Sequence, residues 1–174
     1  MRKEIRQRLE NGESRADVFE QMRGDVGNEE RLAQKIATVR IQPATGRLIY
    51  INYLLLFFVL AQTIFGICAA WIEFGSVHAD LVVEVSFFVG IITVLYVIGI
   101  ARMSFLGFAC FLMFCFMTVA DYIYIFEVTP VISILGLLIA VINFALAYFL
   151  KVRLFPHMGF SAIRKDNQGR FVLE

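Results

Sequence analysis

Charged residues are scarce in the middle of this chain, and basic residues are almost absent from it. The segment from Leu48 to Leu150 contains six charged residues, of which only Arg102 is basic, whereas residues 1–47 contain eighteen. Hydrophobic residues make up 59% of the 174 residues, compared with about 45 to 50% in soluble domains. A soluble core could not bury so many apolar side chains, so a soluble globular fold is excluded for the middle of the chain.

Paired cysteines and catalytic motifs are lacking as well. Cys68, Cys110 and Cys115 all lie in apolar runs and form no CxxC pair, so we expect small packing residues and no disulfide framework. No nucleophile elbow, HExxH motif, P-loop or dinucleotide fingerprint occurs. His78 lies near acidic residues, but without a defined ligand spacing. We therefore expect no enzymatic activity, no cofactor and no metal site.

Four apolar runs fill the middle of the chain, with short polar breaks between them. They cover residues 48–72, 81–101, 105–126 and 131–150, and each is long enough to cross about 30 Å of hydrocarbon. Short connections make neighbouring helices antiparallel. The sequence thus predicts an all-α integral membrane protein: a small helical head (1–47), a four-helix up-down transmembrane bundle (48–150) and a short hairpin-like tail (151–174).

The positions of lysine and arginine predict how this bundle is oriented. Ten basic residues lie in the head, five in the tail and one between the second and third runs, whereas the two opposite loops have none. Because basic residues accumulate on the cytoplasmic side of a membrane, both termini are expected in the cytoplasm. The first apolar run begins near residue 48 and is too long for a signal peptide. We expect a multi-pass protein of a bacterial inner membrane.

The head has three short helical patterns. The first ends at Asn11 and Gly12, the second begins after Ser14 and ends at Gly24, and the third begins after Asn28. Only nine apolar residues could form a core, which is few for an independent unit: Ile5, Leu9, Val18, Phe19, Met22, Leu32, Ala33, Ile36 and Ala37. Ten basic and eight acidic residues are interspersed, which argues against nucleic-acid binding.

The tail has a turn signal at residues 166–169 between two short strand-like runs. A lone hairpin is marginally stable in water. We therefore expect the tail to pack on the head or on a partner protein, and the head to lean on the membrane or a partner.

Small and polar residues recur at heptad spacing in the apolar runs, as expected where membrane helices meet. The pattern is clear in three runs and weaker in the third, where Gly107, Cys110 and Asp121 share a stripe with the bulky Phe114 and Met117. The clear stripes are Gln62, Gly66 and Ala69; Ser86, Gly90 and Thr93; and Gly136, Ala140, Asn143 and Ala147.

Two levels of these stripes are candidate sites. Near the middle of the membrane, roughly 15 to 18 Å from the outer ends of the helices, lie Gln62, Thr93 and Asn143. They are expected to form hydrogen bonds that hold the helices together, or alternatively to line a transport route.

The second level lies roughly 6 to 9 Å from the outer face and brings Asp121 together with three small residues, Gly66, Ser86 and Gly136. One interpretation is a small outward-facing cavity with Asp121 pointing into it and Ser86 as a hydrogen-bond partner. The alternative is a structural carboxylate that reaches water or a neighbouring tyrosine.

These features leave three hypotheses for the function. The first is an accessory or scaffold subunit of the membrane that acts through a protein partner. The second is a homo-oligomeric transporter or channel in which Asp121 is a protonatable or cation-binding group. The third, a membrane immunity protein, fits the size and topology but has no residue-level support.

Overall fold

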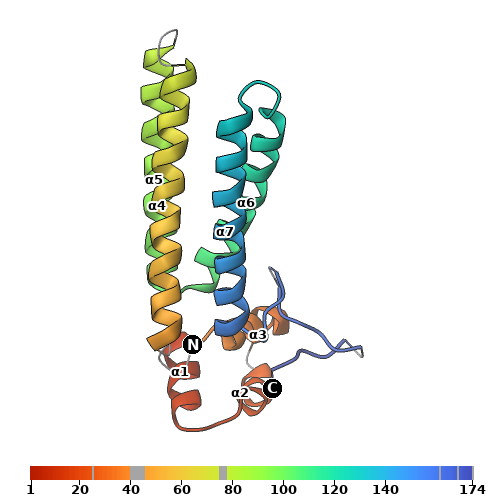
Figure 1. The fold of residues 1–174 in the computed structure, drawn as a ribbon. Coiled ribbons are helices and arrows are strands. Elements are labelled where there is room, and N and C mark those ends of the chain that lie inside the picture. The colour runs from red at the N-terminus through yellow and green to blue at the C-terminus, as the bar shows by residue number, and fades with distance from the viewer. Residues whose placement is uncertain (25, 40–45, 75–77, 161, 168, 174) are drawn as a thin grey trace. The chain divides into compact units, whose positions relative to one another are not determined.

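The structure, a computed structural model, describes residues 1–24, 26–39, 46–74, 78–160, 162–167 and 169–173. Within these ranges it contains seven helices and no strand (Figure 1), which confirms the predicted all-α class. The chain forms two compact units. Residues 46–150 form the membrane bundle, and residues 1–45 together with 151–174 form a second unit. It is called the cytoplasmic unit below, after the location that the sequence predicts for both termini.

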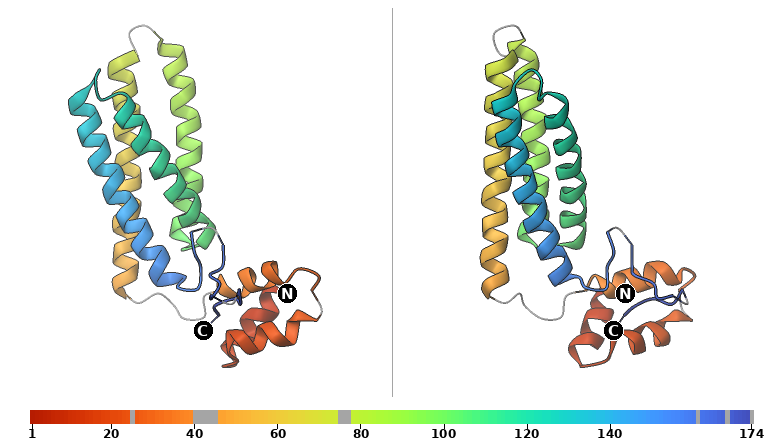
Figure 2. Two further views of the ribbon diagram at one scale, coloured as in Figure 1. Left: turned by 90° about the vertical axis from the view of Figure 1, so that its right-hand side faces the viewer. Right: turned by 45° about the vertical axis from the view of Figure 1, so that its right-hand side comes forward.

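Four helices of the structure are long and apolar enough to cross a membrane, as predicted. They are α4 (Gly46–Phe74), α5 (Ala79–Ala101), α6 (Phe105–Tyr124) and α7 (Pro130–Leu154). The four helices run up and down, and the α5–α6 turn lies at the end of the bundle opposite the α6–α7 turn (Figure 2). Residues 75–77 of the predicted first outer loop lie outside the described ranges.

The turn from α5 to α6 is built from a few local interactions. Arg102 ends α5, and Met103 takes a left-handed backbone conformation with φ 47°. Ser104 then begins α6, because its Oγ accepts a hydrogen bond from the Gly107 backbone N–H at 3.0 Å. A Cβ atom on Gly99 would lie 2.9 Å from the Cα atom of Gly107, so only glycines let the two backbones approach this closely.

The predicted stripe of α7 is buried throughout, whereas in the predicted stripe of α4 Gln62 is buried and Gly66 and Ala69 are half-buried. In α7, Gly136, Ala140, Asn143 and Ala147 are all buried. In α4 the stripe of Gln62 continues toward the start of the helix at heptad spacing, through three further buried residues: Asn52, Leu55 and Val59. Small and polar residues thus mark the protein-facing side of α7, whereas that of α4 combines polar residues with Leu55 and Val59.

The predicted stripe of the third span is wrong in part. Cys110 is exposed and Met117 is 65% exposed; the buried side of α6 is formed instead by Phe108, Phe111, Leu112, Cys115 and Tyr122. The expectation that all three cysteines pack is also wrong, because Cys68 and Cys110 are exposed and only Cys115 is buried. Bulky apolar residues occur on every side of α6, and a bilayer accepts them as readily as a protein core does.

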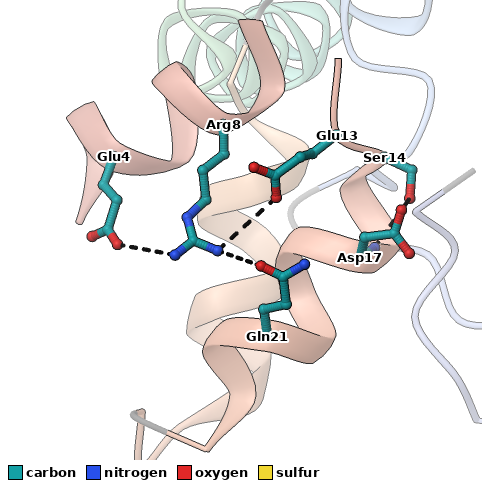
Figure 3. A network of polar contacts seen from close by, with 6 residues as sticks. All are labelled: Glu4, Arg8, Glu13, Ser14, Asp17 and Gln21. Atoms are coloured by element: carbon teal, nitrogen blue, oxygen red, sulfur yellow. Dashed lines mark hydrogen bonds and ion pairs between the residues drawn. The ribbon is translucent and has the colours of Figure 1, made fainter. Parts of the chain in front are cut away.

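The cytoplasmic unit contains the three predicted helices of the head, α1 (Arg2–Glu10), α2 (Arg15–Arg23) and α3 (Glu29–Ala37). Ser14 caps α2 by accepting from the Asp17 backbone N–H, and Asn28 caps α3 by accepting from that of Arg31. All nine apolar residues predicted for the head core are buried. On the surface, Arg8 connects α1 to the α2 residue Gln21 through a 2.6 Å hydrogen bond (Figure 3).

The tail folds back on itself through two isolated antiparallel bridges, Met158 with Ile163 and Lys165 with Phe171. Its predicted turn is present at the described positions, where Gly169 has φ 79° and donates to the carbonyl oxygen of Asp166; Gln168 lies outside the described residues. The tail adds further buried apolar side chains to the unit: Phe155, Met158, Ile163 and Leu173.

Head and tail meet in a direct aromatic contact. The rings of Phe19 in α2 and Phe171 in the tail lie edge to face, with centroids 5.6 Å apart. Such pairs add about 0.5 to 1.5 kcal/mol beyond the area they bury. The small core that the sequence indicates for the head is therefore enlarged by the tail.

Candidate functional site

A cavity of about 370 Å³ lies in the membrane bundle among α4, α5 and α6. It is lined by five of the seven residues singled out from the sequence: Gln62, Gly66, Ser86, Thr93 and Asp121. Ser86 and Asp121 lie near one end of it, where the lining continues to Phe74 and Ile125, whereas Tyr96 and Phe111 lie ten residues away along α5 and α6. At the rise of a helix, this separation corresponds to about 15 Å. Both predicted levels thus contribute to a single elongated cavity.

Gly136 does not line this cavity but shapes one of its walls. A Cβ atom on Gly136 would collide with the ring of Tyr122, so the ring occupies the space that a side chain of α7 would otherwise fill. Tyr122 is buried and lines the cavity. The small residue predicted at this level therefore makes room for a tyrosine of α6.

Asn143 lies behind the cavity and holds one of its lining residues. Its Nδ2 donates to Gln62 Oε1 at 2.6 Å and to the carbonyl oxygen of Phe58 at 3.2 Å. Asn143 is fully buried and Gln62 is 6% exposed. Among the described residues, Gln62 Nε2 has no hydrogen-bond partner, which is costly for a buried amide in an apolar environment.

Thr93 joins a different pair from the one its depth suggests. Its hydroxyl lies 2.9 Å from that of Thr63, which also lines the cavity. Each hydroxyl is also within hydrogen-bond distance of a backbone carbonyl of its own helix, at Val59 or Val89. The two hydroxyl hydrogens are thus shared among three short contacts. The three polar residues of the middle level form two separate groups, Gln62 with Asn143 and Thr93 with Thr63.

Two threonines line the cavity outside the predicted stripes. Thr63 follows Gln62 and therefore lies beside the stripe of α4, not on it. Thr118 lies on α6, and its hydroxyl donates to the carbonyl oxygen of Phe114 at 2.9 Å. The spacing of Phe111, Phe114, Thr118 and Asp121 at intervals of three and four is the signal that could have identified this face.

Asp121 is the only charged side chain that lines the cavity, as far as the described residues extend. It is also exposed, so it lies at the cavity and remains accessible. No hydrogen bond joins it to Ser86 within the described part of the chain. The expected Ser86 partnership is therefore not seen, although both residues line the same cavity.

The opposite end of the cavity is aromatic. The Tyr96 ring lies 5.6 Å from that of Phe111 and 5.3 Å from that of Phe114, centroid to centroid. Phe114, the bulky residue of the predicted third stripe, forms part of this aromatic wall. The cavity thus has a carboxylate at one end and the faces and edges of three rings at the other.

A second hollow, of about 830 Å³, lies in the cytoplasmic unit between α2, the start of α3 and the tail. Charges of both signs line it. Arg23 Nε donates to Glu29 at 2.8 Å, and this hydrogen bond and the charge of Glu29 raise the pKa of the exposed Arg23. Asp166 accepts from the Arg170 backbone N–H at 2.8 Å. This mixture differs from the uniformly basic surfaces that bind nucleic acid.

No group of three metal-ligating side chains gathers anywhere in the described ranges.

No family model matches the chain, and no curated protein and no solved structure matches it either.

Proposed function

We propose that this small multi-pass membrane protein is a non-enzymatic accessory or scaffold subunit that acts through its cytoplasmic unit. The observation that supports this is the shared core of head and tail, with Phe19 against Phe171. The two segments are separated in sequence by the entire bundle. Because they pack together, they form one folded module instead of two solvated tails. A folded module without catalytic motifs is typical of a protein that binds another protein.

The hollow beside α2 is the surface we assign to the partner. Its lining combines the rings of Phe19, which is buried, and Phe171, which is half-buried, with five exposed charged residues: Glu20, Arg23, Glu29, Asp166 and Arg170. Buried apolar residues beside exposed polar ones are typical of a protein interface. The bacterial inner membrane and the cytoplasmic position of both termini belong to the same proposal, and they rest on the distribution of basic residues.

The test is affinity capture from gently solubilised native membranes, with the protein at its native expression level. We expect one reproducible partner in near-stoichiometric amount. Arg23→Ala with Arg170→Ala should release it, whereas the matched control Arg6→Ala, whose exposed side chain pairs with Glu10 in the same helix, should retain it. Recovery of the chain alone, or only of copies of itself, would remove the basis of the accessory role.

A second candidate, a homo-oligomeric transporter or channel, is favoured by the cavity. Four spans seldom enclose a pathway alone, but an intramembrane carboxylate on an accessible cavity is a recurring feature of ion and substrate paths. Proteoliposomes would report this as solute or proton flux that depends on Asp121. Equal flux in wild type and Asp121→Asn would eliminate this candidate.

A further inference from the structure

We propose that the cavity of the membrane bundle binds an amphipathic monocation, a molecule with one positive nitrogen on a flat aromatic body. The proposal concerns binding and does not depend on the accessory role. It deepens the transporter candidate, because it names the class of ligand that Asp121 would hold.

The sign of the ligand follows from the lining. Asp121 supplies one negative charge, and no Lys, Arg or His lines the cavity in the part of the chain that the structure describes. A positive charge near Asp121 is attracted more strongly here than in water, because the surrounding walls are apolar. An anion would meet the carboxylate without any compensating charge, which excludes anionic ligands.

The size and the walls favour an aromatic body. The volume of about 370 Å³ falls within the range of roughly 300 to 1,000 Å³ that is usual for small-molecule sites. Tyr96, Phe111 and Phe114 form a ring cluster at the end away from Asp121. Such clusters stack on planar molecules and attract cations by their ring faces.

Polar groups between the two ends can orient the ligand. Gln62 is more than nine-tenths buried, lines the cavity and has no partner for its Nε2 among the described residues. A ligand acceptor that reached this nitrogen would satisfy it. A few convergent polar groups on an otherwise apolar lining are the usual composition of a small-molecule site.

A phospholipid acyl chain is the competing occupant, because the cavity lies in helices long enough to span a bilayer. A hydrocarbon chain would use the apolar walls but neither Asp121 nor Gln62, and the phosphate of its headgroup would meet the carboxylate unfavourably. The charge of the lining thus favours the monocation. Lipid occupancy is an outcome that the experiment must distinguish.

The experiment measures binding of ethidium, a planar aromatic monocation, to the full-length protein in nanodiscs of zwitterionic phosphatidylcholine. Fluorescence titration should show saturable binding at one site. Asp121→Asn should weaken it about tenfold or more, whereas Glu84→Gln, which removes a carboxylate of α5 that does not line the cavity, should leave it unchanged.

A pair of glycines supplies matched blocking variants. A Cβ atom on Gly66 or on Gly90 would meet nothing within 4 Å, but only Gly66 lines the cavity. The leucine side chain of Gly66→Leu should therefore fill part of the cavity and abolish ethidium binding, whereas Gly90→Leu should retain it. Equal thermal stability of the two variants shows that any difference comes from the cavity.

Three results would overturn the proposal. Ethidium could show only non-saturable partition into the nanodiscs. Its affinity could be the same in wild type, Asp121→Asn and Gly66→Leu. Native mass spectrometry could find a phospholipid that Gly66→Leu releases and ethidium does not displace. Ethidium binding without any flux would eliminate the transporter candidate but not the proposed binding site. Failure to capture a partner protein would contradict only the role proposed for the cytoplasmic unit.

Discussion

The ring of Tyr122 lies over the bare Cα atom of Gly136, so α6 and α7 meet where α7 has no side chain. Gly136→Ala should force the ring aside and destabilise the bundle by about 1 to 3 kcal/mol, as overpacking does in tight cores. Thermal unfolding of the solubilised protein measures the change. Gly90→Ala is the control, because a Cβ atom there meets nothing within 4 Å.

The same contact can be tested by rescue. In Tyr122→Ala the ring is absent, so adding Gly136→Ala should cost much less than it does in the wild-type background. A cost that is equal in both backgrounds would mean that the ring and the glycine do not interact.

The amide pair of Gln62 and Asn143 predicts a coupled effect on stability. Asn143→Leu leaves the Gln62 side chain buried without its partner and should cost about 1 to 3 kcal/mol. The double variant with Gln62→Leu should cost less than the sum of the single ones, measured as unfolding free energies. Thr118→Ala is the control, since its hydroxyl donates to the carbonyl oxygen of Phe114 in its own helix. Strict additivity of Asn143→Leu and Gln62→Leu would contradict the pairing.

Arg15 closes the end of α3, a role not apparent in the sequence. Its guanidinium donates to the carbonyl oxygens of Ile36, Ala37 and Val39 at 3.0, 3.3 and 3.0 Å, where a helix carries partial negative charge. Burial lowers the pKa of Arg15, but an arginine stays protonated in proteins. Arg15→Ala should destabilise the cytoplasmic unit by about 1 to 2 kcal/mol.

Hydrogen exchange of the last turn of α3 measures this effect locally. Exchange should accelerate in Arg15→Ala and to a lesser degree in Arg15→Lys, because an ammonium lacks the planar fork that reaches several carbonyls. Arg6→Ala should leave it unchanged, since an exposed pair within one helix contributes little. Protection that is equal in all variants would show that the contacts do not hold the helix end.

The contact of Phe171 with Phe19 predicts that damage to the tail is felt in the head. Phe171→Ala should accelerate hydrogen exchange in α2 by removing a ring packed on it. Phe160→Ala, which removes an exposed ring of the same tail, should not. Unchanged exchange of α2 in both variants would mean that the two segments are independent.

The proposed orientation predicts opposite reporter activities at two positions. Alkaline phosphatase should be active when fused at His78 and inactive at the C-terminus, and a fluorescent protein should show the reverse. The physical reason is that lysine and arginine resist translocation. Phosphatase activity at the C-terminus would contradict the expected cytoplasmic termini.

The four spans could be predicted because the signal is local: long apolar runs without charge cannot form anything else in a membrane. The stripe of α7 could be predicted because small residues are rare enough to mark one face. The face of α6 could not, because its phenylalanines suit lipid and protein equally. Residue type does not show which side of α6 faces the protein, because one cysteine of this helix, Cys110, is exposed and another, Cys115, is buried.

The cavity could be predicted only in outline. Heptad spacing and depth brought Asp121, Ser86 and Gly66 to one level, and all three line it. The pairing of Thr63 with Thr93 and the ring over Gly136 depend on rotation of the helices and on side-chain rotamers, which a single sequence does not specify. The contact of Phe19 with Phe171 joins segments from opposite ends of the chain and leaves no local pattern.

The shared core of head and tail also orders events during synthesis. The head is made before the four spans, but Phe171, which packs on Phe19, and the buried Leu173 are made only after the fourth span. The core of the head therefore stays incompletely packed until the fourth span has been inserted and the tail has been synthesised. A completely packed cytoplasmic unit therefore forms only in chains that contain all four spans. A chain whose synthesis stops early lacks the tail and leaves apolar residues of the head exposed to proteases.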